Sequence, residues 1–169
     1  MIFVTVGTHE QPFNRLVQAI DEWKGEGKLT EDVIMQTGFC TYEPRHCQWS
    51  KLYPYKEMIR LVGEARIVIT HGGPSSFIMP LQVGKIPIVV PRRKEFDEHV
   101  NNHQVDFSNA VAERQGNLIV VEDVEKLLDV INRYDEIAAG MPASQNSNNA
   151  KFNEDFARVV EELFAEKKK

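Results

Sequence analysis

The sequence is poor in cysteine and contains no long apolar run. Its 169 residues include two cysteines, Cys40 and Cys47. Their spacing matches neither a redox C-x-x-C motif nor a zinc knuckle, so we expect structural thiols in a reducing compartment. No stretch approaches the roughly 20 apolar residues that a membrane span requires. The first residues, MIFVTVGTHE, lack the basic start of a signal peptide. These absences predict a cytoplasmic chain without a membrane anchor of its own.

The sequence also lacks an excess of positive charge. Lysine and arginine number 20 against 25 aspartate and glutamate residues, which gives a formal net charge of -5. This balance argues against a broad phosphate-binding surface, so nucleic acid is not expected as a partner. Hydrophobic residues make up 42% and charged residues 27% of the chain, which excludes disorder and a disulfide-stapled miniprotein. The length fits one domain with one sizeable core.

Short runs rich in β-branched residues alternate with segments of helical period, which is typical of βαβ units around a parallel sheet. We expect strands over residues 2–6, 33–36, 48–53, 66–70, 86–90 and 117–121. We expect helices over residues 13–23, 56–65, 74–83, 97–114 and 124–137. The sequence therefore predicts a single α/β domain over residues 1–169, with five or six strands in a Rossmann-like parallel sheet and helices on both faces.

The C-terminal part has a different character. Residues 140–150 are rich in small and polar side chains, which predicts a linker. Residues 151–166 should form a helix with one apolar face. Its apolar positions include Phe152, Phe156, Val160 and Leu163. This face would either dock on a partner or close the domain's own sheet.

The most informative segment is HGGPSS, which directly follows the strand expected over residues 66–70. Adjacent glycines let the backbone approach a ligand closely, and the following helix N-terminus favours an anion. His71 could donate to a phosphate oxygen, and the hydroxyls of Ser75 and Ser76 could bind the same oxygens or cap the helix. The sequence predicts a diphosphate site here; a simple turn with a good cap is the alternative.

Three other segments invite a functional interpretation. Residues 25–30, GEGKLT, suggest a phosphate loop but follow a helix and lack the full spacing. His99 and His103 have metal-ligand spacing on the expected helix, but HVNNH lacks a zincin glutamate and an obvious third ligand, so no metal is predicted. The basic run of residues 92–94 is either a solvated loop or a contact for a diphosphate, a lipid-linked pyrophosphate or anionic headgroups.

The strings HGGPSS, GKIP and NNHQ together resemble the donor-binding signature of glycosyltransferase family 28 and related UDP-sugar transferases. The resemblance covers nearly the whole chain. It implies that the first cluster contacts the donor diphosphate: His71, Gly72, Gly73, Ser75 and Ser76. It also implies that Gln104, with His103, contacts the sugar.

The loop VTVGTHEQPF resembles the glycine-rich phosphate loop of this family, which makes Gly7 and Thr8 further donor contacts. His9 and Glu10 in the same loop are candidates for two side chains that together act as the catalytic general base. Relatives of full length usually supply that base from their other domain.

One position departs from the family pattern. Where many relatives carry an acidic residue that grips the ribose, this sequence has Met79, and a thioether accepts such hydrogen bonds poorly. Gln82 or Glu95 could hold the ribose instead. The alternative is that Met79 is simply a core residue on an apolar helix.

The resemblance implies the donor-binding half of a GT-B fold, similar to the small catalytic subunits of two-part exopolysaccharide galactosyltransferases and of the eukaryotic dolichol-linked N-acetylglucosaminyltransferase. It implies an inverting transferase that moves a hexose, galactose foremost, from a UDP-sugar to a lipid-linked saccharide. No cofactor or metal is needed. A membrane-anchored subunit would bind the acceptor and hold the chain at the inner face of the membrane.

Two functions from other classes remain open. The first is a non-catalytic regulatory subunit that binds nucleotide sugars in the same pocket. The second is a flavodoxin-like signalling domain, which is disfavoured because the first strand ends Val4–Gly7 without the acidic pair of a phospho-receiver.

Overall fold

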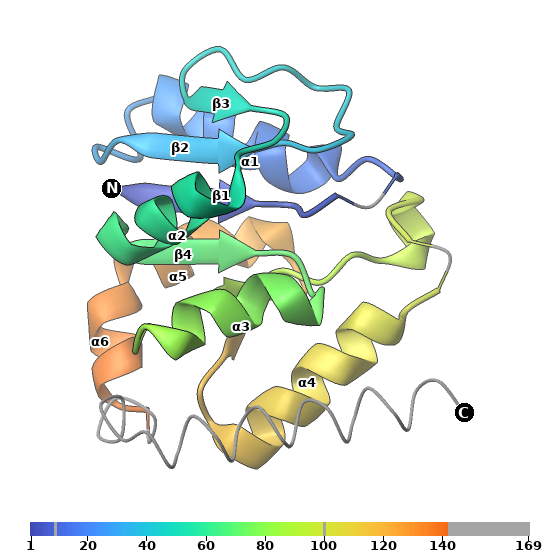
Figure 1. Ribbon diagram of the computed structural model, residues 1–169, viewed down its shortest axis with the longest axis vertical. Helices are drawn as coiled ribbons and strands as arrows, with labels where there is room; N and C mark the ends of the chain where they lie inside the picture. The colour runs from blue at the N-terminus through green and yellow to red at the C-terminus, as the bar shows by residue number, and fades with distance from the viewer. Residues whose placement is uncertain (9, 100, 142–169) are drawn as a thin grey trace.

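The computed structural model describes residues 1–8, 10–99 and 101–141. Within these residues, six parallel strands form one sheet in the order β3-β2-β1-β4-β5-β6. The strands are Ile2–Thr5 (β1), Val33–Gln36 (β2), Gln48–Ser50 (β3), Ile67–Thr70 (β4), Ile88–Val89 (β5) and Ile119–Val120 (β6). The labelled arrows in Figure 1 point the same way. The predicted α/β fold is confirmed.

Helices cover both faces of this sheet (Figure 1). The helices are Asn14–Gly25 (α1), Tyr55–Glu64 (α2), Pro74–Gln82 (α3), His103–Gln115 (α4), Leu127–Asn132 (α5) and Tyr134–Ala139 (α6). Two 3-10 turns, Lys94–Phe96 (η1) and Val124–Lys126 (η2), precede α4 and α5. The apolar clusters place α1, α5 and α6 on one face and α2, α3 and α4 on the other.

The central strand β1 shows how the sequence divides its side chains between the two faces. Ile2 and Val4 pack in the cluster that contains α1 and α5, whereas Phe3 packs against Leu61 and Val62 of α2. All three β1 side chains are buried, because successive residues of a strand point to opposite faces and both faces are covered. The uninterrupted apolar run of β1 is therefore a consequence of its central position.

Helix α4 begins later than the sequence suggested. The expected helix over residues 97–114 starts only at His103, because Asp97 has a left-handed φ of 57° that a right-handed helix cannot contain. The Oδ1 atom of Asn101 accepts the His103 amide at 2.9 Å. The Oδ1 atom of Asn102 accepts the Lys94 amide at 2.9 Å. These side chains compete with helical hydrogen bonding, so the predicted start was wrong.

The later start removes the metal-ligand spacing of His99 and His103. His99 precedes α4, so the two side chains do not share a helical face at i and i+4. In the described part of the chain, no group of three His, Cys, Asp or Glu side chains is placed to hold a metal ion.

The helix expected over residues 124–137 is interrupted. It is divided into η2, α5 and α6, and Arg133 between the last two has a non-helical φ of -106° and ψ of 12°. The break lets the buried Tyr134 hydroxyl donate to the Ile86 carbonyl at 2.6 Å. This contact joins the interrupted helix to the segment just before β5.

The predicted linker and C-terminal helix lie almost wholly outside the described residues, which end at position 141. In the described ranges, no helix is long and apolar enough to cross a membrane.

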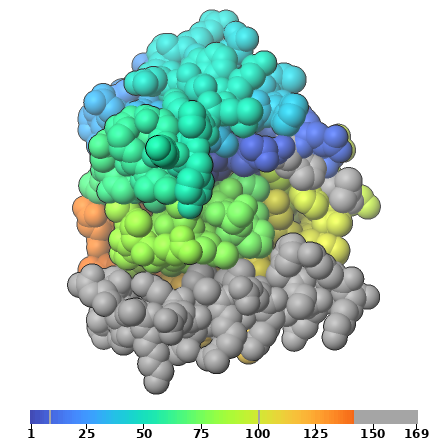
Figure 2. Space-filling view, viewed as in Figure 1, coloured from blue at the N-terminus to red at the C-terminus, as the bar shows by residue number. Residues whose placement is uncertain are grey.

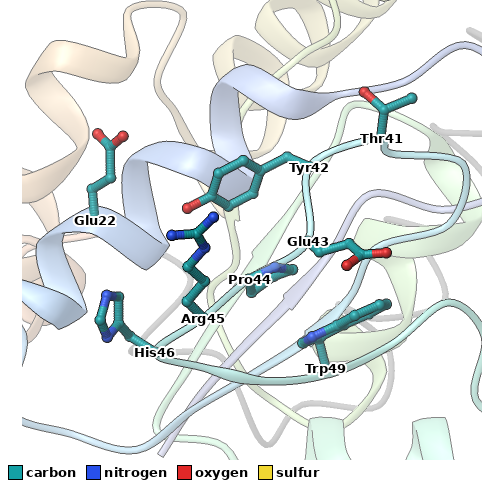
Figure 3. A pocket seen from close by; sticks show the side chains of 8 residues that line it. All are labelled: Glu22, Thr41, Tyr42, Glu43, Pro44, Arg45, His46 and Trp49. Carbon is teal, nitrogen blue, oxygen red and sulfur yellow. The ribbon is translucent and has the colours of Figure 1, made fainter.

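Asp21 on α1 anchors the loop between β2 and β3. Its carboxylate is fully buried and accepts the Tyr42 hydroxyl at 2.6 Å and the His46 amide at 2.8 Å, together with the Arg45 amide. Figure 3 shows Tyr42, Arg45 and His46 on the loop that runs beside this helix. Burial alone would raise the pKa of Asp21, but these hydrogen bonds outweigh it and lower the pKa below its ordinary value.

We expect Asp21→Asn to lower the free energy of unfolding at pH 7 by about 2 to 3 kcal/mol, because bonds to a buried charged acceptor are lost. A carboxyl whose pKa is depressed by folding stabilises above its unfolded pKa, about 3.9, and that stabilisation disappears as the pH falls through its folded pKa. Urea unfolding at pH 7 and pH 3 measures both effects. Asp129→Asn, at a side chain that is 69% exposed, is the control. Equal stability losses in the two variants would contradict this role.

Candidate functional site

The loops that carry the predicted site residues meet at the carboxyl edge of the sheet. The strand order reverses direction between β1 and β4, and the open crevice beside such a switch point is where α/β sheets bind ligands. The loop after β1 contains Gly7 and Thr8, and the loop after β4 contains HGGPSS. The structure therefore brings together two motifs that are more than sixty positions apart in the sequence.

His71 is packed against two of the predicted glycines. Its side chain is buried, with 6% of the residue exposed. A Cβ atom on Gly7 would lie 2.3 Å from His71 Nε2, and a Cβ atom on Gly73 would lie 2.3 Å from His71 Cε1. Gly7 also has a φ of 70°, which glycine adopts without strain. Both glycines are needed to admit the imidazole.

The hydrogen bonds of His71 fix which ring nitrogen carries the proton. The Gly73 amide donates to Nδ1 at 3.2 Å, and the Gln104 side-chain amide lies 3.3 Å from the same atom. Because Nδ1 accepts, the neutral ring carries its proton on Nε2, which lies 3.0 Å from Ser76 Oγ. The Nε2–H group and the Ser76 hydroxyl thus form one donor system at the start of α3.

The start of α3 is where the sequence predicts the anion site, with a simple capped turn as the alternative. Pro74 occupies the first turn, as predicted, and Gly73 is the N-cap residue without a side-chain capping bond. Ser75 and Ser76 follow the N-cap residue, and Ser76 Oγ lies 3.0 Å from His71 Nε2. Both side chains line a cavity in front of the helix N-terminus.

This cavity has a volume of about 650 Å³ and opens between α2, α3 and the loop after β1. In Figure 2 the blue atoms of the β1 loop are visible between the teal atoms around β3 and α2 and the green atoms of α3. The cavity is lined by Thr5, Gly7, Thr8, Gln36, Tyr55, Met58, Val62, His71, Ser75, Ser76, Ile78, Met79 and Gln82. It therefore includes five predicted site residues: Gly7, Thr8, His71, Ser75 and Ser76.

Several lining residues were not predicted from the sequence. Gln36 and Thr5 are register partners at the carboxyl ends of β2 and β1, and both are buried beneath the cavity. Tyr55 begins α2 and is 70% exposed. The signal that could have found Gln36 is its position, since the last residue of a parallel strand next to the switch point faces the ligand crevice.

Met79 fits both interpretations given above. It lines the cavity and also packs against the core cluster beneath α2. Of the two replacement candidates for ribose binding, Gln82 lines the cavity. Glu95 accepts hydrogen bonds from Asn102 at 2.8 Å and Arg93 at 3.0 Å instead, and it is not among the lining residues.

Gln104 lies behind the cavity rather than in its lining. Its Oε1 atom accepts the Gly72 amide at 3.1 Å and the Arg92 amide at 3.0 Å. A Cβ atom on Gly72 would lie 2.8 Å from the Cβ of Gln104, so this glycine permits the close approach. His103 is exposed at the first position of α4. The sugar contacts of Gln104 and His103 stay predictions.

Of the two candidates for the catalytic general base, the structure describes only Glu10. Glu10 is exposed in the loop after β1, and His9 lies outside the described residues. Their catalytic role stays a prediction.

The basic run of residues 92–94 is solvated only in part, since Lys94 is exposed and Arg93 is half-buried. Arg92 is fully buried, and Arg93 pairs with Glu95 at 3.0 Å. The sequence expectation was wrong for Arg92, because its two terminal nitrogens find carbonyl acceptors inside the protein, while its buried Nε has no hydrogen-bond partner among the described residues.

A second groove lies around the loop anchored by Asp21 (Figure 3). Its volume is about 730 Å³, and its lining includes Tyr42, Arg45 and Trp49. It shares no residue with the predicted site. Larger volume alone does not make it the functional site, because the predicted motifs converge elsewhere.

A comparison with protein-family sequence models matches residues 1–163 to the glycosyltransferase family 28 C-terminal domain. The chain belongs to this family. A search of curated protein sequences found no match.

Solved structures show the same fold. The family 28 domain is similar to the calicheamicin glycosyltransferase CalG4, with a TM-score of 0.60 and 15% identity over 97% of this chain and 41% of that chain. It is also similar to the glycosyltransferase of kitacinnamycin, with a TM-score of 0.56 and 16% identity over 96% and 39%. MurG of Acinetobacter baumannii gives a TM-score of 0.51 and 16% identity over 96% and 49%.

These likenesses establish the architecture. The family 28 domain spans less than half of the length of each of these proteins. Its sheet and helices correspond to the C-terminal half of a GT-B glycosyltransferase, as the resemblance implied.

Proposed function

We propose that the chain is the donor-binding half of an inverting glycosyltransferase, which transfers a hexose, galactose foremost, from a UDP-sugar to a lipid-diphosphate-linked saccharide. The observation that carries this proposal is the cavity at the switch point, whose lining combines hydroxyl and imidazole donors with apolar and amide side chains. The proposal assigns the first set to a diphosphate end and the second set to a nucleoside end.

The diphosphate end is formed by Thr8, Ser75 and Ser76 together with His71. These side chains offer hydroxyl and imidazole donors in front of the N-terminus of α3, where the helix dipole favours negative charge. None of the described residues that line the cavity is acidic. A bound diphosphate would therefore meet donors without a repelling carboxylate.

The nucleoside end combines apolar surface with amide groups. Tyr55, Met58 and Met79 provide the surface on which a base can pack. Gln36 and Gln82 reach the same cavity, and their amides can both donate to and accept from a base or ribose hydroxyls. In this proposal Gln82 takes the place of the acidic ribose ligand that Met79 replaces.

The reaction is a displacement at the anomeric carbon. The acceptor hydroxyl attacks from the face opposite the diphosphate, the bond from that carbon to the β-phosphate oxygen breaks, and UDP leaves with the electron pair. The hydroxyl proton passes to a base, for which Glu10, His9 and groups of a partner are candidates. The Nε2–H group of His71 and the α3 N-terminus stabilise the charge that grows on UDP.

The acceptor side belongs to a partner subunit in this proposal. GT-B enzymes bind their substrates between two domains, and the chain spans less than half of the compared glycosyltransferases. The partner would be membrane-anchored, because a lipid-linked acceptor stays in the membrane. It would hold this chain at the inner face.

The donor proposal is tested by melting curves with UDP-galactose, UDP-glucose, UDP-N-acetylglucosamine and NAD. A ligand at about 100 times its Kd stabilises the native state by about 2.7 kcal/mol, so UDP-sugars should raise the Tm and NAD should not. His71→Ala should stay folded and lose the shift. A shift with NAD alone would contradict the proposal.

Transfer is tested with a reconstituted membrane-anchored partner and a lipid-linked acceptor. The proposal predicts UDP release and sugar transfer by the pair, and neither by the chain alone. Donor binding without UDP release by the pair would support the regulatory-subunit alternative.

A further inference from the structure

Arg92 is the largest of the fully buried side chains, and its contacts concentrate on one loop. The residue follows β5, on the far side of β4 from β1. One terminal nitrogen, Nη2, donates to the Val6 carbonyl at 2.7 Å. The other, Nη1, donates to the Gln11 carbonyl at 2.6 Å and to the Glu98 carbonyl at 3.0 Å.

Val6 and Gln11 bracket the loop that contains Gly7 and Thr8. One rigid guanidinium therefore fixes both ends of this loop, and the Phe13 ring supports it at 5.2 Å from the Arg92 Cζ. The backbone amide of Arg92 donates to Gln104, whose side chain in turn contacts His71. Arg92 thus connects the loop after β1 with the groups that orient His71.

Packing alone does not explain an arginine at this position. Burying a guanidinium carries a large desolvation penalty, and an apolar side chain of similar volume would fill the space without it. The Glu98 carboxylate acts on the Arg92 guanidinium only as a nearby charge, because its own ion pair is with Arg15 at 3.0 Å. What an apolar residue could not supply is three directed bonds to carbonyl groups.

Arg92 is also not placed to bind a ligand directly. Its side chain is fully buried and is not among the residues that line the cavity. Its effect on any ligand must be transmitted through the loop that it holds.

We propose that Arg92 is a positioning residue that holds the loop of Gly7 and Thr8 in the conformation that receives the donor diphosphate. The inference rests on the proposed function, because it assigns the diphosphate to that loop. It distinguishes the two ends of the donor: losing Arg92 should weaken contacts to the diphosphate and spare contacts to the nucleoside.

The test compares the affinities of UDP and uridine by calorimetry in Arg92→Lys and Arg92→Met. We expect UDP to bind at least about tenfold more weakly, as for loss of a charge-assisted contact, while uridine affinity changes by less than about twofold. Arg15→Met is the matched control, because Arg15 pairs with Glu98 and its side chain bonds to the Glu122 and Pro91 carbonyls, not to those of Val6 or Gln11. It should leave both affinities unchanged.

Amide hydrogen exchange adds a measurement that needs no ligand. The amides of residues 7–11 should exchange faster in Arg92→Lys than in Arg15→Met. Unchanged exchange there, unchanged UDP affinity, or equal losses of UDP and uridine affinity would each overturn the positioning role. Absence of UDP binding by the wild-type chain would overturn the proposed function and this inference with it. If Arg92→Met does not fold, Arg92→Lys decides.

Discussion

Gly7→Ala is expected to destabilise the domain and to weaken UDP binding at least about tenfold, because the new methyl group would meet His71. The left-handed φ of 70° costs an alanine about 1 to 2 kcal/mol by itself. In addition, the Cβ atom would lie 2.3 Å from His71 Nε2. The imidazole cannot move away without losing its bonds to Gly73 and Ser76.

Gly27→Ala separates these two effects. Gly27 has a φ of 77°, and no atom lies within 4 Å of an added Cβ. The Gly27→Ala variant should lose only the stability that a left-handed φ costs an alanine. It should bind UDP with the wild-type affinity. Urea unfolding and a UDP titration of both variants measure the difference. If the two variants lose the same stability and bind UDP equally, Gly7 does not shape the site.

Gly73→Ala is expected to lower the free energy of unfolding by about 1 to 3 kcal/mol through overpacking alone. Its φ of -73° suits any residue, so no backbone strain contributes. The added Cβ would lie 2.3 Å from His71 Cε1. The affinity for UDP should fall together with the stability, because the His71 imidazole and Ser76 are the proposed hydrogen-bond donors to the diphosphate.

A double-mutant cycle tests whether contact with His71 causes the stability loss in Gly73→Ala. In a His71→Ala background, Gly73→Ala should cost almost nothing, because the ring that it strikes is gone. Gly63→Ala on α2 is the control, since no atom lies within 4 Å of its added Cβ, and it should be neutral or stabilising. An equal stability loss for Gly73→Ala in both backgrounds would exclude a collision with His71.

Together these glycines explain why the motif was recognisable in the sequence. His71 is followed directly by Gly72 and Gly73, so the need for space at Gly73 is local chemistry that the sequence records directly, whereas the need at Gly7 arises only when the fold brings His71 beside it. The alternation of strands and helices was equally readable, because both faces of the sheet are covered and its inner strands must be largely apolar. These features depend on residues close together in the chain.

The parts that could not be predicted depend on contacts between distant segments. Gln36 and Tyr55 reach the cavity only because β2 and α2 lie beside β1. The burial of Arg92 depends on the backbone carbonyl groups of Val6 and Gln11. Every residue has such a carbonyl, so the sequence cannot show which ones will accept a hydrogen bond. The predicted start of α4 was wrong because the side chains of Asn101 and Asn102 accept hydrogen bonds from backbone amides. Whether an asparagine does so depends on the surrounding fold and not on the local sequence alone.

The central claim of the proposal is that UDP binds in the cavity at the switch point. A crystal structure of the chain with UDP tests this claim most directly. The account predicts the diphosphate between Thr8 and the α3 N-terminus, close to His71, Ser75 and Ser76, and the base near Tyr55 and Met79. UDP bound in the groove around Tyr42 and Trp49, or a diphosphate away from the α3 N-terminus, would contradict it.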